Sequence, residues 1–152
     1  KDMPYLFNDD KSILPLEETM DLIWRGAHEA TTGFSIDLDD LGFDRTKYRF
    51  LYIVFENTAG NIDATCLMPI WDSSADHLGD PVLDTFYTYT VNNVVTYVYE
   101  RFIRHTFYDP ARNYISFDNC MHRKELSDNN YDSVEFSFAP TRVIPYEILG
   151  VR

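Results

Sequence analysis

The sequence of 152 residues is long enough for one domain with a single core, and 45% hydrophobic residues with only 6 glycines and 7 prolines exclude a disordered or collagen-like chain. Acidic residues outnumber basic ones 25 to 13, and the net charge of −12 argues against nucleic acid as a partner, because the phosphates would be repelled. Residues 1–10 lack the pattern of a secretory signal, and no apolar run approaches the roughly 18 residues of a membrane span, so no membrane insertion is expected.

The first part of the chain shows the alternation of apolar and polar residues that predicts β-strands. Residues 20–25 alternate in this way, and residues 34–38 do so more regularly before they reach an acidic turn. Residues 48–57 are apolar on both faces, which predicts a central strand that is covered on both sides. In the following apolar stretch Pro69 has no N–H to donate, so it belongs at a strand end, at an edge or at a bulge.

Residues 85–108 are almost all β-branched or aromatic, which predicts two long strands. Asn92 and Asn93 lie between them and tolerate positive φ, so a tight hairpin turn is expected there. The alternative is a helix over residues 94–106. Valine, threonine and tyrosine are poor helix formers, however, and their spacing fits a period of 2 better than one of 3.6.

Three further segments, residues 113–119, 132–140 and 142–151, complete a count of eight or nine strands. Regular short strands with turns between them predict an all-β fold, namely an antiparallel, jelly-roll-like β-sandwich. The expected organisation is a lead-in segment at residues 1–18 and a sandwich domain at residues 19–152.

The sequence contains only weak candidates for metal-binding or reactive side chains. The acidic turn at 37–44 offers hard oxygen ligands for Ca²⁺, but its order departs from that of a calcium-binding loop, and a solvated turn is the simpler interpretation. Cys66 and Cys120 lie far apart with no metal-type spacing, so two reduced, buried thiols are expected, with a disulfide as the alternative. The four histidines are scattered, and neither a bound metal nor a cofactor is expected.

The sequence contains no serine nucleophile elbow and no glycine-rich phosphate loop. A pair of carboxylates for glycoside hydrolysis can be chosen in many ways among 25 acidic residues, so it cannot be assigned. The protein is therefore expected not to be an enzyme, and a glycan-degrading enzyme remains an alternative.

The aromatic excess is the remaining signal. Tyr87, Tyr89, Tyr97 and Tyr99 alternate with other apolar residues, so they cannot all point into one core, and some are expected at an outer surface or a subunit interface. Aromatic side chains in polar loops are also candidates for ligand contact. The candidate ligand-binding residues are two loop aromatics with neighbouring acids, Trp71, Tyr131, Asp72, Asp76 and Asp128.

Three short motifs together resemble a known family. The segments are "LIWRG" at 22–26, "YRFLYIV" at 48–54 and the closing "ILGVR" at 148–152. They are similar to the L-W-x-G opening strand, the Y-x-x-L/I-x-V/I strand and the I-Y-G-I-K type C-terminus of head domains in bacteriophage head-fibre, tail-fibre and baseplate receptor-binding proteins. Ile23 stands where that family has leucine, Arg25 where it has a small polar residue, and Leu149 where it has an aromatic one.

The resemblance implies a non-enzymatic tip domain in the virion, usually a homotrimer among other virion proteins, that attaches the phage to a host surface glycan or protein. A purely structural capsid or tail decoration protein is the alternative. Within the opening motif, Trp24 is expected to be a core residue of the first strand, and Gly26 to let the chain turn.

Overall fold

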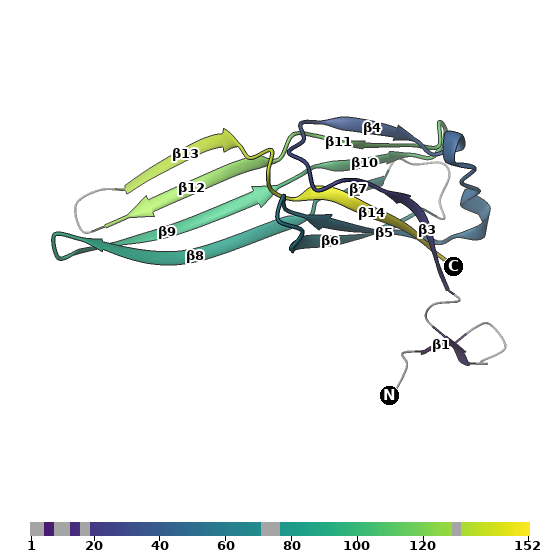
Figure 1. Ribbon diagram of the computed structural model, residues 1–152, viewed down its shortest axis with the longest axis horizontal. Helices are drawn as coiled ribbons and strands as arrows, with labels where there is room; N and C mark the ends of the chain where they lie inside the picture. The colour runs from purple at the N-terminus through teal and green to yellow at the C-terminus, as the bar shows by residue number, and fades with distance from the viewer. Residues whose placement is uncertain (1–4, 8–12, 16–18, 71–76, 129–131) are drawn as a thin grey trace.

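The computed structural model describes residues 5–7, 13–15, 19–70, 77–128 and 132–152, and it confirms the prediction of an all-β fold. Three antiparallel sheets of four strands are present (Figure 1). One sheet has the order β3 (Met20–Arg25), β14 (Ile144–Val151), β5 (Phe50–Glu56), β6 (Ile62–Pro69). A second has the order β4 (Phe34–Asp37), β11 (Tyr114–Phe117), β10 (Thr106–Asp109), β7 (His77–Gly79). The third, here called the arm sheet, has the order β13 (Asp132–Phe138), β12 (Met121–Ser127), β9 (Val94–Ile103), β8 (Val82–Val91).

The first two sheets form a sandwich with the main core between them. Fully buried residues from both sheets share one cluster, among them Ile53 and Met68 from one sheet and Tyr108 and Ile115 from the other. The rings of Phe55 and Phe117 meet across the core edge to face, with centroids 6.0 Å apart. Such interdigitation of two inner faces is what stabilises a β-sandwich, because it removes apolar surface from water.

The arm sheet extends away from this sandwich (Figure 1). Its strands β8 and β9 are ten residues each, about twice the usual strand length, and Asn92 and Asn93 join them with φ values of 50° and 63°. The predicted hairpin is thereby confirmed, and the helical alternative for residues 94–106 is wrong. Only the base of the arm reaches the main core, where Phe102 is buried and Leu83 packs against it.

The remaining elements are small. Two 3₁₀ turns, η2 (Asp39–Leu41) and η3 (Arg45–Lys47), follow β4. A separate two-stranded sheet pairs β1 (Tyr5–Phe7) with β2 (Ile13–Pro15), within the segment predicted to be a lead-in. Among the described residues, no helix is long and apolar enough to cross a membrane.

The predicted count of eight or nine strands is too low, since the three large sheets contain twelve. Strand β12 was missed because His122, Arg123, Lys124 and Glu125 put charged or polar side chains on both of its faces, so alternation is lost. Strand β7 has only three residues, which is too short to show a period. Strand β5 lies between β14 and β6 as predicted, and Pro69 ends the edge strand β6.

Candidate binding surface on the arm sheet

The cross-strand register divides the arm sheet into two faces of different chemistry. Val82, Ile103, Met121 and Phe138 are aligned across the four strands, so they share one face. This apolar face presents eight large side chains, each at least 38% exposed: Val82, Phe86, Val95, Tyr97, Met121, Val134, Phe136 and Phe138. The most exposed of them are Phe86 at 70% and Phe136 at 77%, whereas large apolar side chains in a completed sandwich would be covered.

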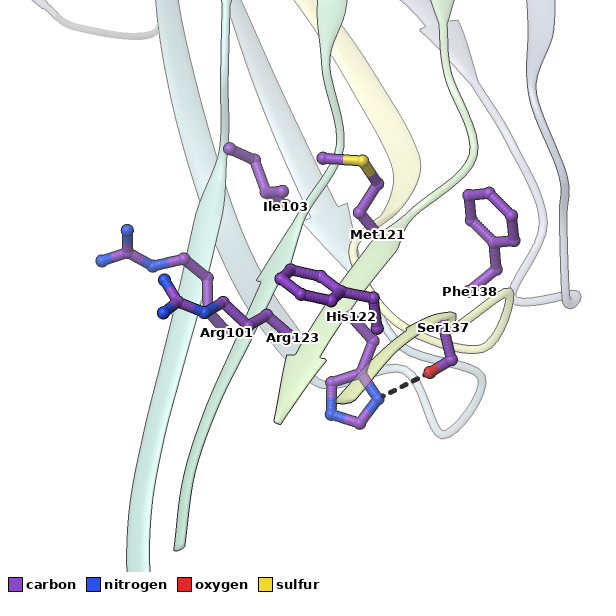
Figure 2. Close-up of a pocket in the computed structure, with 8 residues that line it drawn as sticks. Arg101, Ile103, Met121, His122, Arg123, Ser137 and Phe138 are labelled. Carbon is purple, nitrogen blue, oxygen red and sulfur yellow. Dashed lines mark hydrogen bonds between the residues drawn. The ribbon is translucent and has the colours of Figure 1, made fainter. Parts of the chain in front are cut away.

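A groove of about 300 Å³ lies on the apolar face over β9, β12 and β13, near the base of the arm. Figure 2 shows Ile103, Met121 and Phe138 around the groove, with Arg101 and Arg123 at one side. Phe136 also contributes to the wall. The groove is therefore lined mainly by apolar side chains, which suits an apolar or aromatic group of a partner.

Four of the five charged residues of the apolar face form two ion pairs, and the fifth is Asp132 at the far end of β13. Arg101 donates from Nε and from a terminal nitrogen to the two carboxylate oxygens of Asp84, at 2.8 and 3.1 Å. These hydrogen bonds, together with one from the Tyr99 hydroxyl at 2.9 Å, lower the pKa of Asp84. Arg123 forms an ion pair with Glu125, and its guanidinium lies 6.0 Å from the centroid of Phe136. Around the groove the face thus presents apolar surface and paired charges.

The opposite face of the arm carries exposed tyrosines among polar groups, and it is called the tyrosine face here. Tyr87 and Tyr89 are 44% and 43% exposed and stand two residues apart on β8. The Tyr87 hydroxyl donates a hydrogen bond to Glu100 at 3.1 Å, and its pKa is raised by desolvation and by this carboxylate. Nearby His122 stacks on Phe102 with centroids 4.4 Å apart. Rigid aromatic surface beside hydrogen-bonding groups is typical of polar ligand sites.

The expectation for the four tyrosines is confirmed, because the register puts Tyr87 and Tyr89 on one face and Tyr97 and Tyr99 on the other. The exposed phenylalanines of the apolar face were not identified from the sequence. Val134, Phe136 and Phe138 do alternate with Ser133, Glu135 and Ser137, which predicts that the apolar three share a face. The pattern does not show whether another sheet covers that face.

Four of the five predicted ligand-binding residues, Trp71, Asp72, Asp76 and Tyr131, lie outside the described residues. Asp128 is half-buried and directly follows β12 at the far end of the arm. A role for these five residues in binding stays a prediction.

The acidic turn at 37–44 is part of the fold's hydrogen bonding. Asp37 accepts from the backbone N–H of Asp39 at 3.0 Å, and Asp44 accepts from the backbone N–H of Thr46 at 3.0 Å. Asp39 accepts from the side-chain amide of Asn113 at 2.6 Å. Within the part of the chain that the structure describes, no three histidine, cysteine or acidic side chains are grouped so that they could hold a metal ion.

The three segments that carry the family resemblance are neighbours in one sheet, since β14 pairs with β3 on one side and with β5 on the other. Trp24 packs against the core as expected. Gly26 follows the end of β3, and a Cβ there would lie 2.5 Å from Cη2 of Trp24, so glycine also leaves room for that ring. In the closing segment a Cβ at Gly150 would lie 2.6 Å from the ring of Tyr48, whose hydroxyl donates to Asp21 at 2.7 Å.

The motif residues therefore contact one another across strands that are distant in sequence.

Comparisons of the chain with protein-family models, with curated proteins and with solved structures find no match.

Proposed function

We propose that this chain is the tip domain of a bacteriophage head-fibre, tail-fibre or baseplate protein, that it is located in the virion, and that it attaches the particle to a host surface glycan or protein. The domain acts by binding, without catalysis, and it works as a homotrimer among other virion proteins. The observation that carries this proposal is an arm that projects from the sandwich and exposes aromatic side chains on both faces.

The chemistry of the tyrosine face suits attachment. Tyr87 and Tyr89 offer flat apolar surface, while Glu100 and Lys124 on the same face supply a hydrogen-bond acceptor and a donor for sugar hydroxyls or a polar peptide. Side chains on the strands of a scaffold are also held more rigidly than those on loops, which reduces the entropy lost on binding. The packing of the three motif segments in one sheet further supports the resemblance from which the virion location comes.

A purely structural role as a capsid or tail decoration protein is the second candidate. It is favoured by the apolar face, because a large uncovered apolar surface is typical of permanent assembly. The two candidates differ in whether the free domain recognises cells.

The test is binding of the fluorescently labelled full chain to a panel of bacterial strains, with wall polysaccharide purified from binding strains as competitor. We expect saturable binding that unlabelled chain competes, no release of reducing ends from the polysaccharide, and at least about tenfold weaker binding for the double variant Tyr87→Ala, Tyr89→Ala. The matched control is Leu78→Ala, which removes a side chain 73% exposed on β7 of the sandwich.

Absence of binding to every strain would favour the decoration role. Release of sugar fragments would contradict the non-enzymatic proposal. A parallel double variant, Trp71→Ala with Tyr131→Ala, tests the loop residues predicted from the sequence: a loss of binding that matches the tyrosine-face variant would assign them to the site, and unchanged binding would remove them.

A further inference from the structure

We propose that the apolar face of the arm sheet is the contact between copies of this chain, and that Phe86 of one copy enters the groove over β9, β12 and β13 of another. This contact gives a surface to the self-association that is part of the proposed function. It rests on the proposed function only for the identity of the partner, a second copy of this chain.

The extent of the apolar face fits a stable interface. With about 200 Å² for a fully exposed aromatic side chain, the eight side chains, at 38% to 77% exposure, present on the order of 800 Å². The largest apolar patch of a monomer usually covers only about 300 to 600 Å². Each partner of a standard interface contributes about 800 Å². Contact with another copy removes this surface from water.

The charges of the apolar face are compatible with a second copy as the partner. The whole chain carries a net charge of −12, so most contacts between copies would bring like charges together. On this face, however, Arg101 is paired with Asp84 and Arg123 with Glu125, and the one further charged residue, Asp132, lies at the far end of β13. Covering the two pairs leaves none of these four ions without its counter-ion, which is the costly outcome in a buried contact. Apolar surface with paired charges that meets an identical surface satisfies this condition.

Phe86 lies outside the groove on the same face. The groove is lined by residues of β9, β12 and β13, and its β9 residues Arg101 and Ile103 lie on the sandwich side of Tyr99, the cross-strand partner of Phe86. The ring of Phe86 instead lies beside that of Tyr97, toward the hairpin, with centroids 6.5 Å apart, so it does not fill the groove of its own chain. The groove volume of about 300 Å³ accommodates a phenylalanine ring from another chain.

The free edge of strand β8 also favours contact with another copy. Asp84 is the one charged residue among its ten, and the strand contains no proline or lysine, which are the usual protections of an exposed edge. Edge strands of this length and composition associate with other chains unless something covers them. Because Phe86 is on β8, the Phe86 ring and the free edge of β8 belong to the same contact.

The experiment measures the mass of the full chain by light scattering and sedimentation equilibrium from about 1 to 100 µM, a range that detects dissociation constants in the micromolar region. We expect the wild type to assemble. Phe86→Asp and Phe136→Asp should each weaken association by about 100-fold or more, since each removes a central aromatic contact. The matched control Tyr87→Asp, next along β8 but on the opposite face, should assemble like the wild type.

A mixing experiment tests the complementarity directly. The Phe86→Asp chain keeps its groove and the Phe136→Asp chain keeps its Phe86, so an equimolar mixture should form complexes that neither variant forms alone. Both substitutions are at highly exposed positions, and unchanged circular dichroism will show that the fold is intact.

A wild type that stays monomeric, assembly of Phe86→Asp at wild-type strength, or a mixture without complexes would each overturn the inference. The outcome is separate from that of the attachment test. A monomeric wild type that binds cells overturns only this contact, and an assembled wild type that binds no cells overturns only attachment.

Discussion

The Nε of Arg104 donates a hydrogen bond of 2.6 Å to the backbone carbonyl of Val143, and this contact joins the arm to the sandwich. Arg104 follows the arm strand β9, while Val143 precedes β14 of the sandwich. Val143 has a φ of 47°, which is rare for a β-branched residue, and its N–H donates to Asp63 at 2.9 Å. Asp63 also accepts two hydrogen bonds of 2.9 Å from Arg142. These bonds hold an unfavourable backbone conformation where the arm begins.

Replacing Arg104 should destabilise the whole fold. Its side chain is fully buried and its hydrogen bonds go to the carbonyls of Thr31, Thr32, Asp118, Arg142 and Val143. Burial lowers the pKa of the guanidinium without neutralising it, so these carbonyls solvate a cation inside the protein. We expect Arg104→Met to lower the free energy of unfolding by about 3 kcal/mol, because buried carbonyls lose their donors.

Urea unfolding of Arg104→Met, monitored by circular dichroism, measures this loss. The control is Arg112→Met, whose side chain is 80% exposed and should change stability by less than about 0.5 kcal/mol. Equal stability of the two variants would contradict a structural role for the buried cation.

The closing motif should be sensitive to one added methyl group. Gly150→Ala places a Cβ 2.6 Å from the ring of Tyr48, and Tyr48 is held by its hydrogen bond to Asp21. We expect a loss of about 2 kcal/mol in the free energy of unfolding from this overpacking. Gly42→Ala provides the comparison, since it has open space but a φ of 68°, and it should cost about 1 kcal/mol through backbone strain alone. Thermal unfolding of both variants ranks the two effects, and a smaller loss at Gly150 would argue against the clash.

The turn at the end of the arm should accept glycine. Asn92 and Asn93 both adopt positive φ, as a type I′ hairpin requires. Asn93→Gly should therefore raise stability or leave it unchanged, within about 0.5 kcal/mol, while Asn93→Val should lower it by more than about 1 kcal/mol, because a β-branched residue resists this conformation. The measurement is the midpoint of thermal unfolding. Equal midpoints for the two variants would show that the turn does not limit the arm.

The thiols of Cys66 and Cys120 should be inert in the folded protein. Both are buried and unpaired, and burial raises the pKa of each to about 11. A thiol-specific reagent at pH 8 should modify them only after denaturation, when two thiols per chain should react. Rapid modification of either thiol in the native protein would contradict the burial.

The same shifts predict a loss of stability at alkaline pH. The unfolded thiols ionise near 9.0, whereas the folded ones stay protonated up to about 11. The unfolded state therefore binds fewer protons over this interval, and the free energy of unfolding falls as the pH rises through it. The double variant Cys66→Ala, Cys120→Ala should show a weaker dependence between pH 9 and 11, and an unchanged slope would assign the effect to other groups.

The sequence by itself determined the local features of this protein. Strand alternation, the central position of residues 50–56, the edge position of Pro69 and the hairpin at Asn92 and Asn93 all follow from side-chain period, backbone dihedrals or a missing N–H. Each of these properties belongs to a few adjacent residues, so it can be read without knowing what lies around them. The all-β class follows from the repetition of such segments along the chain.

Only the tertiary structure decided which surfaces are covered. The alternation of Phe136 and Phe138 predicts a shared face, but that this face is open depends on the arm sheet's projecting beyond the sandwich. Likewise, the highly charged segment β12 is a strand because it pairs with β9 and β13. Arginine is normally exposed, and Arg104 is buried because loops distant in sequence fold around it. Burial and strand pairing depend on contacts between residues far apart in the sequence, and local periodicity carries no information about which segments will meet.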